Sequence, residues 1–538
     1  MGDAPTRTGA GLVLAVLGAG QFLMTLDSSV MNVSMATVAA DVGTTITGIQ
    51  TAITLYTLVM ATLMITGGKI GAMLGHRRAF GIGLVIYGIG STTTALAPNL
   101  AILLLGWSLL EGLGAALIMP AIVSLVASNF PSERRAGAYG LVAAAGAAAV
   151  AVGPLLGGAV TTFASWRYVF AGEVVLVVMI LAVLRRIEDA PASSAVRLDI
   201  VGSALSVLGL GMVVFGVLRS SEWGWVQSKP NGPQVFGLSP VVWLLMGGMV
   251  VLYGFMRWQI RMTAKGREPL VRPGILRNRQ LGGGLTMFFA QFLIQAGVFF
   301  SVPLFLSVVL ELSALETGLR ILPLSAALVL AAAGIPKFLP DASPRRVVRA
   351  GLASMIVGIV MLVAGVDPAA DASVVMVPML FMGFGLGALS SQLGAITVSS
   401  VADSESAEVG GLQNTATNLG ASLGTALIGS ILIATLTGSV LAGIEDNPAV
   451  PASVAERASI ELADGVPFLS TPQLQDALTS AGVTGQTADA VVEINADARL
   501  DALRVALAVT ALLAITALFV TGLLPRRAIG RARAASEL

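Results

Sequence analysis

Three acidic residues lie inside long apolar stretches of the sequence: Asp27, Glu111 and Glu173. An ionised carboxylate at the centre of a bilayer costs about 2.5–3.5 kcal/mol on insertion scales, so such acids face water, a partner or a functional site. Removing a carboxyl group from water favours its protonated form, which suits reversible protonation in a site that wets and dries in turn. These acids are therefore the candidate proton-coupling residues. The alternative is a structural role, in which a neutral carboxyl bonds a neighbouring helix, and this alternative is strongest for Glu173.

A second group of polar side chains, without charge, lies in the later half of the chain. Gln291 and Gln295 are four residues apart and so share one face of a helix, among Phe288 and Phe292. Amides among aromatic rings, with acids across from them, suit amphipathic and cationic compounds through apolar contact, cation–π attraction and charge. We therefore predict that these four residues line a substrate cavity. The alternative is that the phenylalanines face lipid or the protein core.

The composition argues against several other kinds of site. The chain has no cysteine and a single histidine, His76, which argues against disulfides, thiolate or histidine-rich metal sites and a Ser-His-Asp triad. No nucleotide-binding motif occurs, which argues against transport powered by ATP. We expect no enzymatic activity, no metal, no nucleic-acid partner and no cofactor, with a proton gradient as the energy source.

Membrane-spanning helices must position these residues. Of the 538 residues, 55% are apolar and only 11% are charged, against about 25% charged in soluble domains. The predicted fold class is therefore an all-α polytopic membrane protein with 14 transmembrane helices. The apolar segments cover residues 11–33, 49–67, 79–97, 100–122, 138–160, 168–184, 200–218, 240–256, 281–309, 318–335, 349–366, 374–398, 410–436 and 503–524.

The distribution of basic residues predicts the orientation of these spans. With the N-terminus inside, most of the 31 lysines and arginines fall in inner loops, as the positive-inside rule requires of the cytoplasmic side. An even number of spans then places both termini in the cytoplasm, with the protein in a plasma (inner) membrane. The basic residues left outside are Arg167, Arg219, Lys229, Arg320, Arg457, Arg499 and Arg504.

The spans divide the chain into three parts. Residues 1–190 hold the first six spans, residues 191–279 an inserted pair of spans and a cytoplasmic linker, and residues 280–538 the last six spans. The longest segment between spans, 438–502, is predicted to lie outside as a solvated cap. It is rich in acids and includes helix-like runs such as 471–480. The alternative for this segment is a partner-binding element.

The fifth span, within residues 139–158, is built almost wholly from Gly, Ala and Val. Such a helix gains little by facing lipid, and its small residues let a second backbone approach closely. Gly153 and Gly157 are four residues apart and share one face of the helix, as do Pro154 and Gly158. Pro154 is expected to kink the span. The stretch therefore predicts a tightly packed helix.

The order Gly-Pro-Leu-Leu-Gly-Gly at 153–158 resembles the antiporter motif of the fifth span in the major facilitator superfamily, which marks proton-coupled exporters. The segment 26–33, with Asp27, is similar to the first-span signature of its fourteen-span drug:proton antiporters, and segments 166–170 and 410–424 resemble two further motifs. The resemblance covers nearly the whole chain. It implies a major facilitator fold, in which two six-helix halves plus two inserted spans rock around a midplane cavity.

The loop after the second span resembles the cytoplasmic gate loop of the same family. Its glycines and its terminal basic pair are present: Gly67, Gly71, Gly75, Arg77 and Arg78. Ala72 stands where the family has an aspartate that helps to lock the gate, so restoring the acid should favour the state closed to the cytoplasm. Ser108 and Glu111 stand where the family has Arg and Gln.

Together these features predict a proton-coupled secondary active transporter of the multidrug efflux and antibiotic resistance type, which exports amphipathic or drug-like compounds by alternating access. Asp27 is the expected proton carrier because its motif is intact, and Glu111 is either substrate-facing or a second proton site. Both acids are expected to face the central cavity. The expected partners are the lipid bilayer, a small amphipathic substrate and protons, and the protein is expected to be a monomer.

Two alternatives to this function remain open. The first is a transporter of the same fold that moves a lipid or metabolite with different coupling or direction. Ala72, Ser108 and Glu111 motivate it, because each departs from the family pattern. The second is a membrane scaffold or sensor that transports nothing. Acids retained within the spans argue against this second alternative, because a chain without transport has little reason to tolerate their cost.

Overall fold

A computed structural model describes residues 7–44, 46–189, 197–229, 232–367, 370–402, 405–462, 466 and 468–526. In these residues the regular structure is helical, apart from one isolated bridge between Val235 and Leu238. Thirteen helices are long and apolar enough to cross a membrane. The predicted all-α polytopic class is therefore confirmed, and the number fourteen is compatible with the structure.

Helix α3 (His76–Ala95) lies on the remaining predicted span, 79–97, and packs against α5 and α7. It begins with His76, Arg77 and Arg78 and ends with a run of serine and threonine from 91 to 94. These polar ends lower its hydropathy, so α3 is not among the thirteen helices. Its position in the bundle suits a spanning helix, and fourteen spans stay a prediction.

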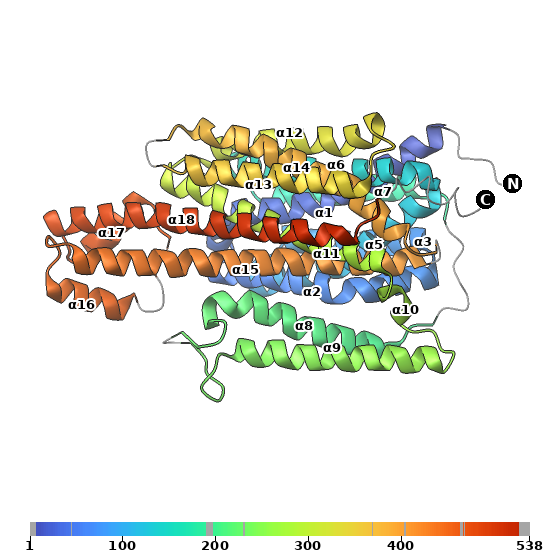
Figure 1. Cartoon of the computed structure of the whole chain (residues 1–538), viewed down its shortest axis with the longest axis horizontal. Coiled ribbons are helices and arrows are strands. Elements are labelled where there is room, and N and C mark those ends of the chain that lie inside the picture. The colour runs from blue at the N-terminus through green and yellow to red at the C-terminus, as the bar shows by residue number, and fades with distance from the viewer. Residues whose placement is uncertain are drawn as a thin grey trace.

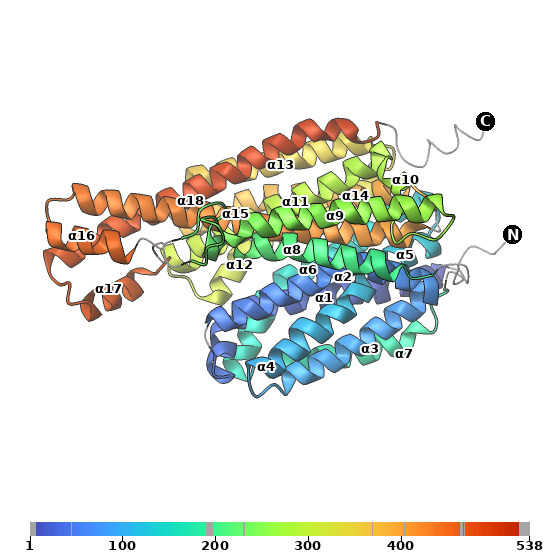
Figure 2. The same cartoon turned by 90° about the horizontal axis from the view of Figure 1, so that it is seen from below.

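The first half of the chain forms one helical group (Figure 2). Helices α1 and α6 pack along each other, and α3 packs against α5 and α7. Residues 100–129 form one span that contains a π-helical stretch, η1, between two α-helical parts. Besides α3, the elements are α1 (Arg7–Asp41), α2 (Ile46–Leu74), α4 (Leu100–Leu103), η1 (Leu104–Glu111), α5 (Gly112–Asn129), α6 (Ser132–Phe163) and α7 (Arg167–Leu184).

The second half packs in the same way, with α12 against α14, α13 against α14 and α11 against α15. Its helices carry most of the largest hydrophobic core. The elements are α10 (Pro273–Leu276), α11 (Arg279–Leu304), η2 (Phe305–Val309), α12 (Ala314–Phe338), α13 (Pro344–Gly365), η3 (Ala372–Val375), α14 (Met376–Val398), α15 (Ser406–Asp446), α16 (Ala452–Glu461), α17 (Thr471–Ser480), α18 (Gln486–Val520) and η5 (Thr521–Leu523).

The inserted pair, α8 (Ile200–Trp223) and α9 (Pro240–Ala264), lies side by side along the flank of the bundle (Figures 1 and 2). Helix α8 contacts α2 of the first half and α15 of the second half, whereas α9 contacts α8 and α10. The pair therefore covers one seam between the halves.

Helices α15 and α18 continue well past the predicted spans, and α16 and α17 lie at their far end (Figure 1). Helix α17 covers Thr471–Ser480, the helix-like run that the sequence indicated. The start of α1 and the end of α18 lie at the opposite end of the bundle, which we call the termini side (Figures 1 and 2). The predicted outer segment is thus mostly helical and lies away from both termini.

Glycines bring the two halves into close contact on the termini side. A Cβ atom added to Gly140 of α6 would lie 2.5 Å from the carbonyl oxygen of Ala332 in α12. A Cβ atom added to Gly394 of α14 would lie 3.0 Å from the ring of Tyr139. Gly411 of α15 approaches the backbone of α2 at Ile65 in the same way. The two halves are therefore in close contact on the termini side, where residues larger than glycine would not fit at these points.

Candidate functional site: a buried carboxyl cluster beside a central cavity

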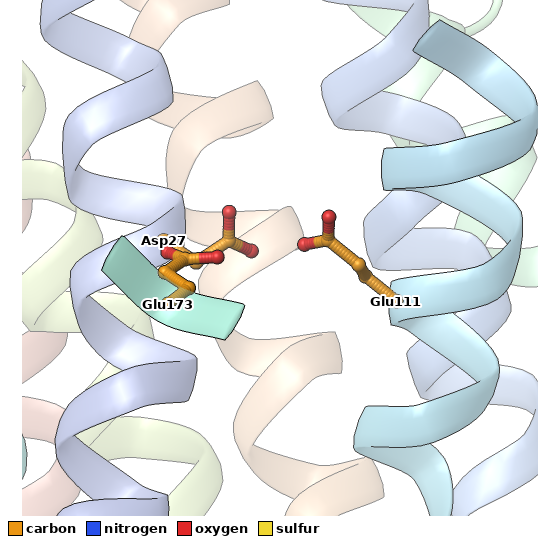
Figure 3. Close-up of side chains that lie close together, drawn as sticks. All are labelled: Asp27, Glu111 and Glu173. Atoms are coloured by element: carbon orange, nitrogen blue, oxygen red, sulfur yellow. The ribbon is translucent and has the colours of Figure 1, made fainter. Parts of the chain in front are cut away.

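The three in-span acids come together in the first half of the bundle. Asp27 of α1, Glu111 at the end of η1 and Glu173 of α7 each offer an oxygen, and these oxygens lie within 4.8 Å of one another. Figure 3 shows the three carboxyl groups pointing toward one another, with Glu111 opposite the other two. Their exposed fractions are 0%, 0% and 2%. We call these three residues the carboxyl cluster.

One oxygen of each carboxyl group is held in place by a neighbouring side chain. The donors are uncharged and come from α3 and η1. The bonds run from Trp107 Nε1 to Asp27 Oδ1 (2.7 Å), from Thr94 Oγ1 to Glu111 Oε1 (3.0 Å), and from Ser91 Oγ (2.8 Å) and Tyr87 Oη (3.2 Å) to Glu173 Oε2.

The second oxygen of each carboxyl group has no hydrogen-bond partner. In the described part of the chain, no lysine or arginine forms an ion pair with any of the three. Ser108, which stands where the resembled family has arginine, instead donates to the Ala52 carbonyl at 2.8 Å. Two carboxylates about 4 Å apart repel by about 4 kcal/mol at an effective dielectric of 20. The cluster is thus arranged to gain stability when protons or another positive charge enter it.

Glycines and the π-helical stretch make the close approach of these residues possible. A Cβ atom added to Gly90 of α3 would lie 2.7 Å from Glu111 Cγ, and one added to Gly106 would lie 2.8 Å from the Thr94 nitrogen. The backbones of α3 and η1 therefore cross almost in contact. The Trp107 ring stacks on Tyr56 of α2 at 5.0 Å, which fixes the indole that bonds Asp27.

Glu173 is the least expected member of the cluster. Of the three acids, it is the one for which the sequence most strongly favoured the structural alternative. In the structure the Glu173 carboxyl is almost as buried as that of Asp27 and lies close to it, because α7 packs on both α1 and α3. The signal that could have indicated this convergence is the serine and threonine run of α3, whose polar face needs buried acceptors.

A central cavity of about 430 Å³ lies between the two halves. It is lined by α1, α2, α5 and α6 of the first half and by α11, α12, α14 and α15 of the second half. The four residues predicted to line a cavity, Phe288, Gln291, Phe292 and Gln295, all do so. Gln291 donates to Ser390 Oγ at 3.2 Å, and its own amide oxygen is buried without a partner.

The lining of this cavity contains no charged side chain among the described residues. The first half contributes the methionines Met24, Met60, Met64 and Met119, whose flexible thioethers adapt to ligands of different shape. Sequence reasoning missed this methionine wall, because methionines scattered over three helices give no local pattern. It also missed a set of polar lining residues, Gln21, Thr25, Ser28, Gln413, Asn414 and Asn418.

The expectation that Asp27 and Glu111 face the cavity is wrong. Neither residue lines it, and both are fully buried among the helices of the first half. The reason is helix geometry: Met24, Thr25 and Ser28 form the cavity face of α1, and Asp27 projects from a different face. A substrate-facing role for Glu111 is therefore excluded in this conformation. Helix α1 is the wall that the cluster and the cavity share.

The small-residue motif holds this shared wall in place. A Cβ atom added to Gly157 of α6 would lie 3.0 Å from both methyl carbons of Val30 in α1, and Gly153 meets Ser29 even more closely. Gly158 is half-buried. The side chain of Pro154 lies outside the described residues, so its predicted kink stays a prediction. Gly153 and Gly157 thus face α1 together, as their spacing indicated.

The predicted gate loop is anchored within its own half. Gly75 takes a positive φ of 94° between α2 and α3, a conformation that favours glycine. Arg77 donates to the Ile187 carbonyl at 2.8 Å, and its backbone nitrogen donates to Asp189 at 3.0 Å. Arg78 is exposed. Burial lowers the pKa of the His76 imidazole, although the Asp189 charge opposes this effect.

The remaining glycines of that loop serve helix packing. Gly67 of α2 meets the Ala116 carbonyl of α5, and a Cβ atom added to Gly71 would lie 3.1 Å from the His76 ring. Ala72 is half-buried. None of the contacts described for this loop at Gly67, Gly71, Gly75 and Arg77 reaches the second half.

Known proteins resemble this chain along most of its length. The sequence profile of the Major Facilitator Superfamily matches residues 17–425. The puromycin resistance protein pur8 of Streptomyces alboniger is 29% identical over 453 residues, which cover 82% of this chain and 85% of that protein. The cephamycin export protein CmcT of Amycolatopsis lactamdurans is 30% identical over 450 residues, which cover 82% of this chain and 87% of that protein.

Solved structures support the same fold. The human organic anion transporter MFSD10 superposes with a TM-score of 0.54 at 13% identity, covering 78% of this chain and 93% of that one. The proton:xylose symporter XylE superposes with a TM-score of 0.51 at 15% identity, covering 78% and 88%. At such low identity the likeness concerns the fold alone. With the profile match and the relatives, the chain belongs to the major facilitator superfamily, a family of transporters rather than of enzymes.

Proposed function

We propose that this protein exports drug-like, amphipathic compounds from the cytoplasm in exchange for protons. The observation that carries the proposal is the carboxyl cluster, which lies against the helix that also lines the central cavity. The two relatives are a puromycin resistance protein and a cephamycin export protein, which agrees with this direction and substrate class. The termini side is then the cytoplasmic side, as the distribution of basic residues predicts.

The proton is proposed to bind between the oriented carboxyl groups. Each group keeps one oxygen fixed by Trp107, Thr94 or Ser91 and presents the other toward its neighbours. A proton shared between two such oxygens relieves their repulsion and makes a hydrogen bond in a dry site. Loss of the proton restores the repulsion and favours a conformation in which the acids reach water.

Helix α1 is proposed to couple this event to substrate binding. Met24, Thr25 and Ser28 touch the cavity on one face of α1, and Asp27 belongs to the cluster on another. The two ligands therefore do not compete for the same atoms. Each changes the other's affinity only through the conformation of α1 that it favours.

The substrate is proposed to be uncharged where it binds. The cavity offers amides, hydroxyls, methionines and phenylalanines but no charged group among its described lining residues. This departs from the cationic compounds that the sequence also allowed, since the acids expected across the cavity lie elsewhere. Neutral compounds with aromatic rings and a few hydrogen-bonding groups fit such a lining.

Purified protein in liposomes tests the proposal. An imposed proton gradient should drive accumulation of a neutral amphipathic dye, and substrate addition to detergent-purified protein should release protons. The double variant Asp27→Asn/Glu111→Gln should lose both effects, while the exposed-site variant Asp501→Asn should keep both.

Other outcomes would replace parts of the proposal. Accumulation driven by a sodium gradient, without proton release, would make sodium the coupling ion of the cluster. Full gradient-driven transport by the double variant would remove Asp27 and Glu111 from coupling. Absence of transport and of proton release in the unmodified protein would favour a scaffold or sensor.

A further inference from the structure

Five charged residues form a network between the two halves on the termini side. Lys69 of α2 bonds Glu268 at 3.4 Å, and Glu268 is 3.6 Å from Arg272. Arg272 bonds Glu405 at 2.7 Å, and its backbone nitrogen donates to Glu408 of α15. Lys69 belongs to the first half, Glu405 and Glu408 to the second half, and Glu268 and Arg272 to the linker between them.

The network is more than a set of exposed ion pairs. The Lys69 side chain is only 6% exposed and that of Glu405 16%, whereas Glu268 and Arg272 are 33% and 43% exposed. Exposed pairs contribute little to stability, but linked and partly buried ones are screened less by salt. Here Glu268 and Arg272 lie in the linker. Their bonds to Lys69 and Glu405 connect the linker to both halves.

The linker is itself fixed to the inserted helix pair. We call residues 265–272 the strap. The Gln259 side chain of α9 is fully buried, and its Oε1 accepts hydrogen bonds from the backbone nitrogens of Leu270 (2.7 Å) and Val271 (3.2 Å). The Gln259 amide donates in turn to Asp199 at 2.9 Å, and Asp199 caps the start of α8.

The position of the helix pair explains what the strap can do. Helix α8 contacts α2 and α15, which belong to different halves. Near the other end of α8, Trp225 donates to Ser430 of α15 at 3.3 Å. Arg272 leads directly into α10 and α11 of the second half. The strap thus joins the second half through the chain and through Arg272–Glu405, and the described ion pair between the strap and the first half is Lys69–Glu268.

We propose that the strap is the cytoplasmic lock of this transporter, and that Lys69–Glu268 is the bond that opens when the cavity turns to the cytoplasm. The inserted helix pair then has a defined purpose, which is to carry the strap across the seam. The strap takes the place of the lock that Ala72 leaves incomplete in the gate loop. The inference rests on the proposed alternating-access transport, and its tests are chosen to report separately on the lock.

The first test uses cross-linking, for which a chain without native cysteine is well suited. Lys69→Cys/Glu268→Cys protein is treated in liposomes with a short, reducible bifunctional thiol reagent. Cross-linking should reduce dye transport at least about tenfold, with recovery on reduction, because the halves can no longer separate. The matched control is Gln280→Cys/Ser399→Cys, whose parent side chains bond at 3.0 Å within the second half. Its cross-link should leave transport within about twofold.

The second test does not depend on transport. A single Thr417→Cys in the cavity lining is labelled with an impermeant thiol reagent applied from the cytoplasmic face. Adding Lys69→Gln should raise the labelling rate at least about threefold, because the locked state loses stability relative to the open one. The exchanged pair Lys69→Glu/Glu268→Lys should restore the original rate, and Lys265→Gln, at an exposed lysine of the strap, should not change it.

Two results would overturn the inference. One is a fully cross-linked 69–268 protein that transports at the rate of the control pair. The other is a labelling rate that Lys69→Gln leaves unchanged. If the unmodified protein transports nothing, the proposed function fails, whereas the labelling rates still decide whether the strap holds the cytoplasmic side closed.

Discussion

The carboxyl cluster and the central cavity lie on two faces of α1, and they differ in almost every property. The cluster consists of three acidic residues, is buried, and belongs to the first half alone. The cavity is uncharged, about 430 Å³ in volume and shared by both halves. Under the proposed function, the ion and the substrate therefore act on one helix from separate places. Coupling would then depend on helix movement rather than on competition for a common carboxylate.

The largest expected effect comes from neutralising Asp27. Asp27→Asn keeps an oxygen for the Trp107 donor but cannot exchange a proton, so export driven by a pH gradient should fall by about 100-fold. Substrate affinity should change by less than about twofold, because Asp27 does not touch the cavity. Transport in liposomes and binding by calorimetry measure the two quantities. If substrate affinity fell as much as transport, the cluster and the cavity would not be separate sites.

The shared wall can be disturbed without touching either site. Gly157→Leu places a side chain against Val30, where even a Cβ atom would lie at 3.0 Å, so α1 must move from α6. Transport should fall at least about tenfold with normal membrane insertion. Gly172→Leu on α7 is the control, since a Cβ atom there has nothing within 4 Å. Near-normal efflux by Gly157→Leu at equal expression would show that close α1–α6 packing is not needed.

A change confined to the cavity should have the opposite signature to Asp27→Asn. Gln291→Leu removes a cavity-lining amide whose nitrogen donates to Ser390 and whose oxygen is buried without a partner. One lost hydrogen bond of about 1 kcal/mol weakens substrate affinity about fivefold. The dependence of transport on pH should stay the same, which a pH series of initial rates will show. A shifted pH dependence would link Gln291 to the cluster and blur the distinction between the two sites.

The smallest expected effect belongs to Ala72, which lies outside both sites. Ala72→Asp restores, one helical turn after Lys69, the acid that helps to lock the gate in the resembled loop. The population of the closed state should therefore rise, but by less than about threefold. Slower labelling of Thr417→Cys from the cytoplasmic face measures this gain. An unchanged rate would exclude position 72 from the lock.

Local patterns predicted the parts of this protein that depend on local order. Apolar segment length predicted the helices, and the spacing of Gln291 and Gln295 predicted a common face that lines the cavity. The convergence of Glu173 with Asp27 depends on how α7 packs against α1 and α3, which no single helix encodes. The bond from Lys69 to Glu268 joins residues 199 positions apart. In the sequence these two residues look the same as other charged residues in the loops between spans.

The winding of the π-helical stretch η1 determines the direction in which Glu111 points. Leu104–Glu111 is wound wider than the α-helical parts on either side and ends at Glu111. A π-bulge holds one residue more than an α-helix of the same length, and bulges of this kind are common at functional sites. If the stretch tightened to an α-helix, every side chain beyond it would turn by about 100°. Glu111 would then rotate out of the group of acids, so a change of winding within one span could set how many carboxyls meet around Asp27.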